Sequence, residues 1–196
     1  MEEEIEDIWP LPHYNPGGRL HLHALGVIAV TYASFEQSIE RLYSWSDRAD
    51  YLQQNSKDRL HCLIDKFRNQ EPRLAKPVSN IVEYFNVCTW NRNQLLHAER
   101  YSAAFGGDGQ SLYLTKPSAK SGDENRYFKI ELSELRLIAD QMRAGFVKCG
   151  EIHIYRRFGD WPESIVPQMY KPYVCSGPPT PIILPHKLNL RTAPPK

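Results

Sequence analysis

The stretch ALGVIAVTYASFEQSIERL, residues 24–42, decides the fold class of this chain. Its apolar side chains recur at alternating steps of three and four residues, a spacing that keeps them on one face of an α-helix. These side chains belong to Leu25, Ile28, Tyr32, Phe35, Ile39 and Leu42. The pattern predicts a long amphipathic helix from Leu20 to Ser44 with its apolar face in a core.

A weaker helical pattern precedes two prolines, and a stronger one follows them. The weaker pattern is carried by Leu60, Leu63, Ile64 and Phe67, with Ser46 or Asp47 as the N-cap. Proline lacks an N–H group and disrupts helix interiors, so Pro72 and Pro77 are expected to separate the two helices. The inner stripe of the third helix consists of Val78, Ile81, Val82, Phe85, Cys88, Leu95 and Leu96.

The helical pattern stops at the glycine-rich residues 105–109. Leu112 and Leu114 follow, and residues 126–132 alternate between polar and apolar side chains, so the two runs predict a short antiparallel hairpin. Ser133 is expected to cap a last long helix. Its inward side chains are Leu135, Ile138, Ala139, Met142, Phe146 and Cys149.

Composition divides the chain into three zones. Residues 1–18 are acidic and rich in proline and glycine, which predicts an extended lead-in. Residues 19–160 hold nearly all of the periodic pattern and predict one helical domain. Residues 161–196 carry nine of the fifteen prolines, which predicts an extended tail largely without regular structure. The expected fold is mostly α: a four-helix-bundle-like core, a short β-hairpin before the last long helix and a proline-rich C-terminal tail.

The overall composition argues against several classes of protein. With 24 basic and 23 acidic residues, the net charge of +1 disfavours nucleic-acid binding by bulk charge alone. The four cysteines form no C-x-x-C pair, so a zinc site lacks its ligand spacing, and neither a metal nor another cofactor is expected. The acidic start and the short apolar runs predict neither a signal peptide nor a membrane span, and a cytoplasmic location is expected.

The informative polar stretch is WNRNQLLHAE, residues 90–99, at the C-terminal end of the third helix. Each residue of an α-helix turns by about 100°, so Asn93 and His97 project within about 40° of each other. Asn86 and Trp90 extend the same face toward the N-terminus. The spacing therefore predicts one polar face opposite the apolar stripe.

Arg92 falls where that apolar stripe would continue. An unpaired buried charge costs several kcal/mol, so the guanidinium is expected to reach solvent or to meet a carboxylate. Glu36, beside Phe35 on the first helix, is the expected partner, and Glu40 is the second choice. Either ion pair holds the guanidinium near the end of the helix.

The arrangement Arg92-Asn93-x-x-x-His97 resembles the R-x4-H motif of HEPN domains (the higher eukaryotes and prokaryotes nucleotide-binding family), which are α-helical bundles. The Phe35-Glu36 pair on the first helix adds to this resemblance, which extends over residues 19–155 in architecture. It implies a homodimeric, metal-independent ribonuclease with Arg92, Asn93 and His97 as active residues, of the kind found among toxins and defence effectors. Because other family members are catalytically silent, a non-catalytic dimerisation or partner-binding module is the alternative.

Cleavage of RNA by these side chains is also reasonable from their chemistry alone. RNA carries a nucleophile, the 2′-hydroxyl next to the scissile phosphate, and an imidazole with a pKa of about 6.5 removes or returns protons near neutral pH. A guanidinium offers planar donors to the phosphate oxygens. His97 and Arg92 supply these two groups, and Asn93 is expected to orient His97 or to hold the ribose-phosphate.

Structural roles compete with each of these assignments. His97 also suits capping of the last helical carbonyls, and Arg92 suits a purely structural ion pair. Trp90 is more typical of a packing or dimer-contact residue than of a base-stacking platform. His21 and His23 do not share a helix face, so no metal site is expected there. A nucleotide-binding domain that recognises phosphate through Arg92 without cleavage is a third interpretation.

Two peripheral features extend the predicted partners. Lys116 and Lys129 from the hairpin are expected to form, with Arg156 and Arg157 from the last helix, a weak basic rim for RNA phosphates, with a solvated surface as the alternative. The proline-rich tail suits docking on a second subunit or a protein partner, or plain disorder.

Overall fold

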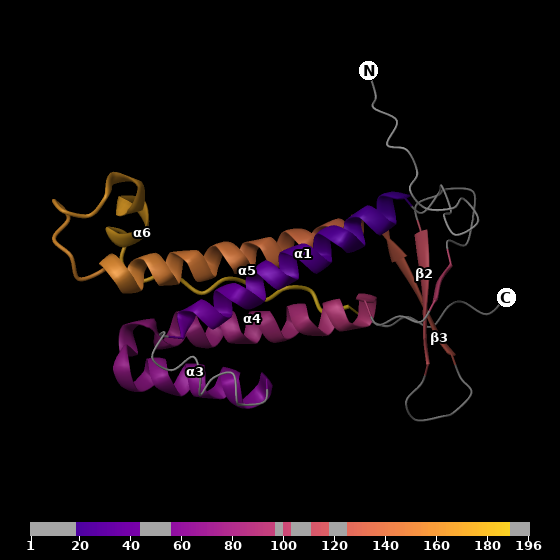
Figure 1. The fold of residues 1–196 in the computed structure, drawn as a ribbon, viewed down its shortest axis with the longest axis horizontal. Coiled ribbons are helices and arrows are strands. Elements are labelled where there is room, and N and C mark those ends of the chain that lie inside the picture. The colour runs from indigo at the N-terminus through magenta and orange to yellow at the C-terminus, as the bar shows by residue number, and fades with distance from the viewer. Residues whose placement is uncertain (1–18, 44–55, 97–99, 103–110, 118–124, 189–196) are drawn as a thin grey trace, which may run out of the picture.

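The computed structural model describes residues 19–43, 56–96, 100–102, 111–117 and 125–188, and within them the protein is mostly helical (Figure 1). Four long helices account for most of it: α1 (Arg19–Leu42), α3 (Ser56–Gln70), α4 (Pro72–Leu96) and α5 (Leu132–Phe158). The strands are β1 (Arg100–Ser102), β2 (Ser111–Pro117) and β3 (Asn125–Glu131). A 3-10 turn, η4 (Gln168–Tyr170), and the short α6 (Lys171–Val174) follow α5. The predicted lead-in (1–18), Ser46, Asp47 and residues 189–196 of the tail lie outside the described residues.

Helix α1 is the element predicted most accurately. All six side chains of its predicted stripe are buried. The helix packs against α5 and α4, while α3 packs against α4. Figure 1 shows these helices running side by side along the long axis of the molecule. The amphipathic pattern thus determined which face of α1 meets the core.

An aromatic cluster joins α1 to α4 at the centre of this core. The Phe35 ring lies edge-on to Phe85, with 5.1 Å between their centroids, and the Tyr32 ring stacks on Phe85 at a centroid distance of 5.5 Å. From α5, Gly145 faces the same cluster, because a Cβ atom added there would come within 2.5 Å of the Phe35 ring. A glycine at this position therefore allows α5 to approach the aromatic rings closely.

Helix α4 departs from the prediction at its start, because Pro77 does not separate two helices. α4 begins at Pro72 and continues through Pro77, which is buried. The first four N–H groups of a helix have no intrahelical acceptor, so Pro72 removes no main-chain bond and Pro77 removes one. A proline this close to the N-terminus is therefore accommodated within the helix.

Helix α5 differs from the prediction at two residues. Ser133 is not the cap, since the helix begins at Leu132 and Glu131 stands at the N-cap without a side-chain hydrogen bond. Phe146 was expected to point inward but is 40% exposed, and the neighbouring Gly145 is buried instead. The reason is the close approach of the aromatic cluster, which leaves room at the helix crossing for a glycine but not for a larger side chain.

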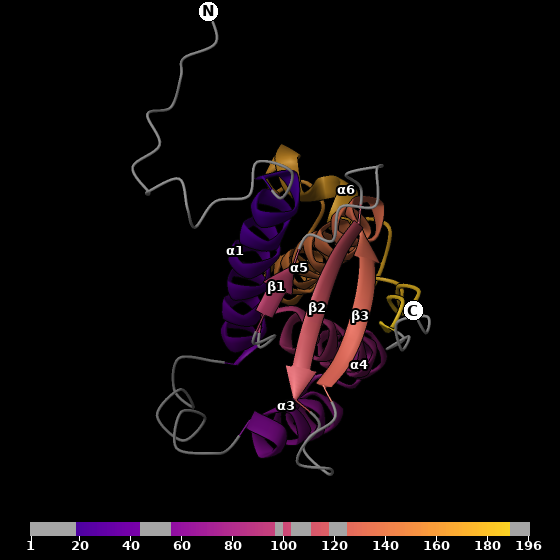
Figure 2. The same ribbon diagram turned by 90° about the vertical axis from the view of Figure 1, so that its right-hand side faces the viewer.

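The predicted hairpin is confirmed. β2 and β3 pair antiparallel, with Leu112 opposite Ile130 and Leu114 opposite Phe128. β1 adds a third antiparallel strand on the free side of β2, which the sequence did not predict. Figure 2 shows the sheet lying across one end of the helices. The buried Ile130 side chain belongs to the main core.

The chain after α5 is only partly extended. η4 and α6 give residues 168–174 regular structure where none was predicted, and Phe158, Val166 and Val174 form a second small apolar cluster there. A pair of hydrogen bonds from the Arg73 guanidinium to the Asp160 carboxylate, one of them 2.6 Å long, ties this region to α4. Residues 175–188 then run back along the helices without regular structure (Figure 1).

Candidate functional site

Arg92 and Asn93 contact each other near the C-terminal end of α4. An Nη1 N–H of Arg92 donates a hydrogen bond of 2.9 Å to the Oδ1 atom of Asn93. The guanidinium carbon lies 5.3 Å from the centroid of the Tyr32 ring on α1. A guanidinium stacks readily on an aromatic face, so the amide and the ring together orient Arg92.

Tyr32 forms the floor beneath this guanidinium. Its hydroxyl lies 3.1 Å from the Thr89 hydroxyl of α4, within hydrogen-bond distance. Burial raises the pKa of the Tyr32 hydroxyl above its ordinary value, and the Glu36 carboxylate shifts it in the same direction. The phenol therefore stays neutral and serves as a packing surface and hydrogen-bonding group.

Glu36, the predicted partner of Arg92, is exposed on α1. Its carboxylate and the Arg92 guanidinium both act electrostatically on the Tyr32 hydroxyl, in opposite directions. Both charges thus lie near the hydroxyl of one tyrosine. The direct ion pair between Arg92 and Glu36 stays a prediction.

The predicted polar face of α4 is described as far as Asn93, because His97 lies outside the described residues. Trp90 is 39% exposed, and the Nζ atom of Lys187 lies 4.3 Å from the centroid of its ring. Asn86 is exposed and Asn93 is half-buried. This face is therefore open to solvent at Asn86 and Trp90, and its relation to His97 stays a prediction.

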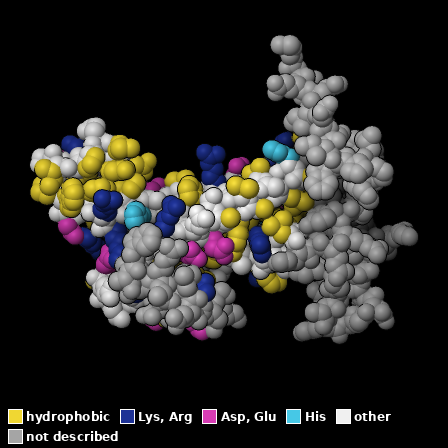
Figure 3. Space-filling model, viewed as in Figure 1, with side chains coloured by type: hydrophobic (Ala, Val, Ile, Leu, Met, Phe, Trp, Pro, Cys, Tyr) yellow, Lys and Arg dark blue, Asp and Glu magenta, His cyan; other side chains and the backbone are white. Residues whose placement is uncertain are grey.

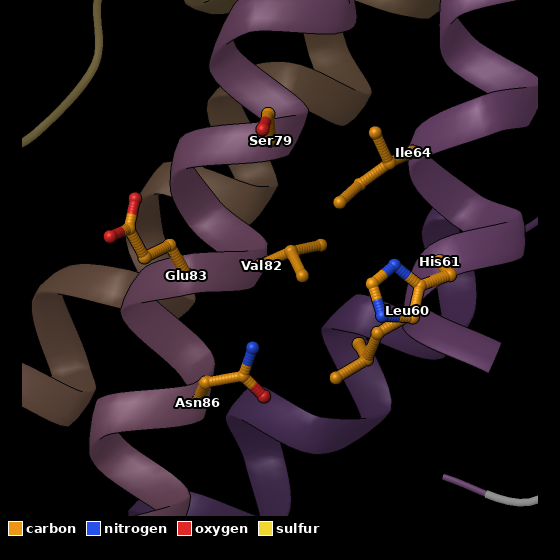
Figure 4. A pocket seen from close by; sticks show the side chains of 7 residues that line it. All are labelled: Leu60, His61, Ile64, Ser79, Val82, Glu83 and Asn86. Atoms are coloured by element: carbon orange, nitrogen blue, oxygen red, sulfur yellow. The ribbon is translucent and has the colours of Figure 1, made fainter. Parts of the chain in front are cut away.

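A shallow hollow of about 190 Å³ lies beside Asn86, between α3 and α4 (Figure 4). Leu60, His61 and Ile64 line it from α3, and Ser79, Val82, Glu83 and Asn86 line it from α4. Asn86 points toward α3, whereas the Glu83 carboxylate points away from it (Figure 4). The hollow is smaller than the 300–1,000 Å³ usual for ligand pockets, so it does not define a site by itself.

Two asparagines that the sequence analysis did not select hold the C-terminal chain on α4. The Asn80 side chain bonds both main-chain groups of Ile182, and the Asn91 side chain bonds the main chain at His186 and Leu188. Asn91 is 1% exposed. The signal in the sequence is that each asparagine interrupts the apolar side of its helix, whereas the predicted polar site lies on the opposite face.

The four predicted basic residues are not brought together. Lys116 and Lys129 belong to β2 and β3, while Arg156 and Arg157 end α5. The 27 residues of α5 span about 40 Å, and β3 directly precedes the first of them, so the two pairs lie near opposite ends of this helix. One basic rim made of all four residues is therefore not formed, and phosphate binding by either pair alone stays a prediction.

Other side chains with catalytic or metal-binding potential are separated or sequestered. His21 is buried in α1 while His23 is exposed, as expected for residues two apart on a helix. Within the described ranges, no group of three or more histidine, cysteine, aspartate or glutamate side chains is placed to hold a metal ion. Burial raises the pKa of the Cys88 thiol to about 12, which keeps this sulfur protonated and unreactive.

Comparison with protein-family models, curated proteins and solved structures finds no match to this chain. Among the described helices, none has the length and apolar character needed to span a bilayer. The candidate site is therefore defined by its geometry alone: an arginine near the end of α4 is oriented by an amide and a tyrosine ring.

Proposed function

We propose that the protein is a HEPN-like, metal-independent endoribonuclease in which Arg92, Asn93 and His97 act together. The observation that carries this proposal is the hydrogen bond between Arg92 and Asn93 over the Tyr32 ring. His97 follows Asn93 by four residues in the sequence. The four long helices support the proposal as the elements of a HEPN-like bundle.

In the proposed reaction, His97 removes the proton from the ribose 2′-hydroxyl as this oxygen attacks the neighbouring phosphorus. Arg92 donates hydrogen bonds to the non-bridging oxygens, where negative charge grows in the transition state. The bond to the 5′-oxygen breaks, that oxygen takes up a proton from water as it leaves, and His97 returns its own proton to water afterwards. The products are a 2′,3′-cyclic phosphate and a 5′-hydroxyl, and no metal ion takes part.

The proposed enzyme is a homodimer that associates through an exposed apolar stripe on α1. Leu20, Val27 and Val30 lie on one side of this helix and are 60%, 39% and 69% exposed. Figure 3 shows hydrophobic side chains over the region where Figure 1 places α1. A two-fold dimer through this stripe places the two α1 helices at the interface, and each α1 carries on its inner side the Tyr32 that contacts Arg92.

The test is cleavage of a fluorescent single-stranded RNA by the purified full chain in excess EDTA. We expect R92A and H97A each to lower the rate at least about 100-fold, because each removes a group that acts in the transition state. R136A and H153A are matched controls, since both residues are exposed and lie on α5. Cleavage that persists in both R92A and H97A, or a chain that cleaves no RNA, contradicts the proposal.

A second candidate function is partner binding without catalysis. The end of the molecule around α6 exposes Trp161, Ile165, Met169 and Tyr173, which are 46%, 60%, 70% and 41% accessible. Exposed apolar clusters of this kind mark interaction surfaces. Sedimentation equilibrium separates the two candidates: V27S/V30S dissociates the proposed ribonuclease dimer, whereas I165S/M169S weakens association through the α6 end.

A further inference from the structure

The C-terminal strap, residues 179–188, is held on α4 through its main chain. The Asn80 side chain donates to the Ile182 carbonyl at 3.0 Å and accepts from the Ile182 N–H at 2.8 Å. The Asn91 side chain donates to the His186 carbonyl at 2.7 Å and accepts from the Leu188 N–H at 2.9 Å. Each asparagine thus replaces the partners that a neighbouring strand would offer.

The spacing of the two asparagines matches the extended strap. Eleven residues separate Asn80 from Asn91, which is close to three helical turns and about 16 Å of rise. Along the strap, five residues separate Ile182 from Lys187, and an extended chain covers about 16 Å in that length. Leu188 is buried in the main core and Ile182 packs against it. Both ends of this segment are therefore anchored in register with α4.

Lys187 is the residue that this anchoring directs onto the candidate site. It lies between the two residues that Asn91 holds, and its side chain is exposed. Its ammonium lies 4.3 Å from the centroid of Trp90, which shares a helix face with Asn93. The strap therefore adds a cation to the proposed RNA-binding face from a part of the chain almost 100 residues away.

We propose that Lys187 binds a phosphate of single-stranded RNA and that the strap, fixed by Asn91, positions it. This inference rests on the RNA site of the proposed function. A positive side chain next to an aromatic ring is the combination with which proteins bind single strands, the ring stacking on a base and the cation contacting the backbone. Trp90 stays 39% exposed beneath Lys187, so ring surface is open to a base. A cation–π contact at an exposed site is weak, so the ammonium turns to a phosphate at little cost.

The test measures binding of a fluorescein-labelled 2′-O-methyl oligouridine by anisotropy at several KCl concentrations. This probe lacks the 2′-hydroxyl nucleophile, so binding is separated from cleavage. We expect K187Q to weaken binding about five-fold and to lower the magnitude of the salt slope by about 0.7, the value for one phosphate contact on a single strand. K171Q, on α6, is the matched control and leaves both quantities unchanged.

Asn91 is tested as a positioning residue in a double-mutant cycle. N91A leaves the charge of Lys187 in place but releases the strap beside it, so we expect the same fall in salt slope as in K187Q. The double variant is expected to show no further loss, because the two changes remove one contact. Circular dichroism melting confirms that each variant is folded at the assay temperature.

The outcomes separate this inference from the proposed function. Wild-type binding with an unchanged salt slope in K187Q overturns the role of Lys187 and leaves the ribonuclease proposal standing. A K187Q effect in a chain that cleaves no RNA supports Lys187 and rejects cleavage. Absence of wild-type binding to the probe overturns the inference.

Discussion

Two arginines mark the two ends of α4, and each stacks on an aromatic ring. Arg156 reaches the start of α4 from α5, whereas Arg92 lies near the C-terminal end of α4 itself. The Arg156 guanidinium lies 5.2 Å from the Phe67 centroid, its Nε atom lies 2.6 Å from a Glu71 carboxylate oxygen, and its Nη1 N–H donates to the Leu42 carbonyl at 2.8 Å. These contacts join the ends of α1, α3 and α5 to the start of α4. Arg92, by contrast, donates a hydrogen bond to its neighbour Asn93 and lies over the Tyr32 ring.

The difference shows that the neighbours of an arginine indicate whether it serves to hold the fold together or to bind a ligand. Arg156 was a predicted RNA-binding residue, yet its fork is engaged by a carboxylate and by a carbonyl at a helix end. Arg92 is oriented by the Asn93 amide and the Tyr32 ring. The first arrangement serves folding, and the second is the one on which the proposed phosphate contact rests.

The largest expected effect is that of R156A. Removing the guanidinium leaves the half-buried Glu71 carboxylate and the Leu42 carbonyl without this partner, so we expect a loss of about 3 kcal/mol in the free energy of unfolding. R92A is expected to cost less, about 1 kcal/mol, because it removes the contact with the Tyr32 ring and the hydrogen bond to Asn93. Urea denaturation followed by circular dichroism measures both. Equal losses of stability in R156A and R92A would contradict the assignment of a larger structural role to Arg156.

A substitution midway between the two ends tests the core that they share. In G145A, the new Cβ atom meets the fully buried Phe35 ring, so we expect a loss of about 2 kcal/mol in unfolding free energy. Gly150 on the same helix has open space around it, and G150A is expected to gain up to about 1 kcal/mol from helix propensity. The same urea assay applies, and a stabilised G145A variant would contradict the close helix crossing.

The two asparagine anchors of the strap are expected to contribute less to the free energy of unfolding, and to contribute unequal amounts. N91A removes a buried side chain that satisfies two main-chain groups, and we expect a loss of about 1.5 kcal/mol. N80A removes the same number of bonds at a half-buried position, where water replaces them, and we expect about 0.5 kcal/mol. Hydrogen exchange at the Leu188 and Ile182 amides reports each anchor separately. Faster exchange at both amides in N80A would mean that the strap detaches as one unit.

The smallest expected effect is a pH dependence of the free energy of unfolding that arises from His153, close to Arg156 on α5. Partial burial, together with Arg156, Arg157 and Arg41, holds the pKa of His153 below its ordinary value of 6.5. Folding thus favours the neutral imidazole, whose contribution is complete above pH 6.5 and is lost as the pH falls through the lower pKa of the folded state. Because solvent still reaches part of this side chain and screens its charge, we expect H153Q to remove less than about 0.5 kcal/mol of stability change between pH 7 and pH 5. Denaturation at both pH values measures the difference, and an unchanged profile would exclude His153 as its source.

Much of the fold was predictable because it depends on local periodicity. The stripe of α1 and the antiparallel pairing of β2 with β3 follow from helix and strand geometry, and both predictions are confirmed. Pro77 and Phe146 were misassigned because their environments depend on the position within a helix and on a neighbouring glycine that faces another helix. The candidate site was predictable only as a motif, since the Tyr32 contact with Arg92 spans 60 residues.

By itself, the sequence determined that the chain is helical, which side of α1 is buried, and where two strands pair, because each property repeats over a few neighbouring residues. Only the tertiary structure decided that Arg156 joins helix ends, that Lys187 lies over Trp90, and that the strap, residues 179–188, is bound to α4. These contacts join residues far apart in the chain, and the strap is bound through main-chain N–H and C=O groups, which all residue types except proline share. A main-chain hydrogen bond leaves little trace in the side-chain pattern, so the docking of the strap is visible only once the helices have packed.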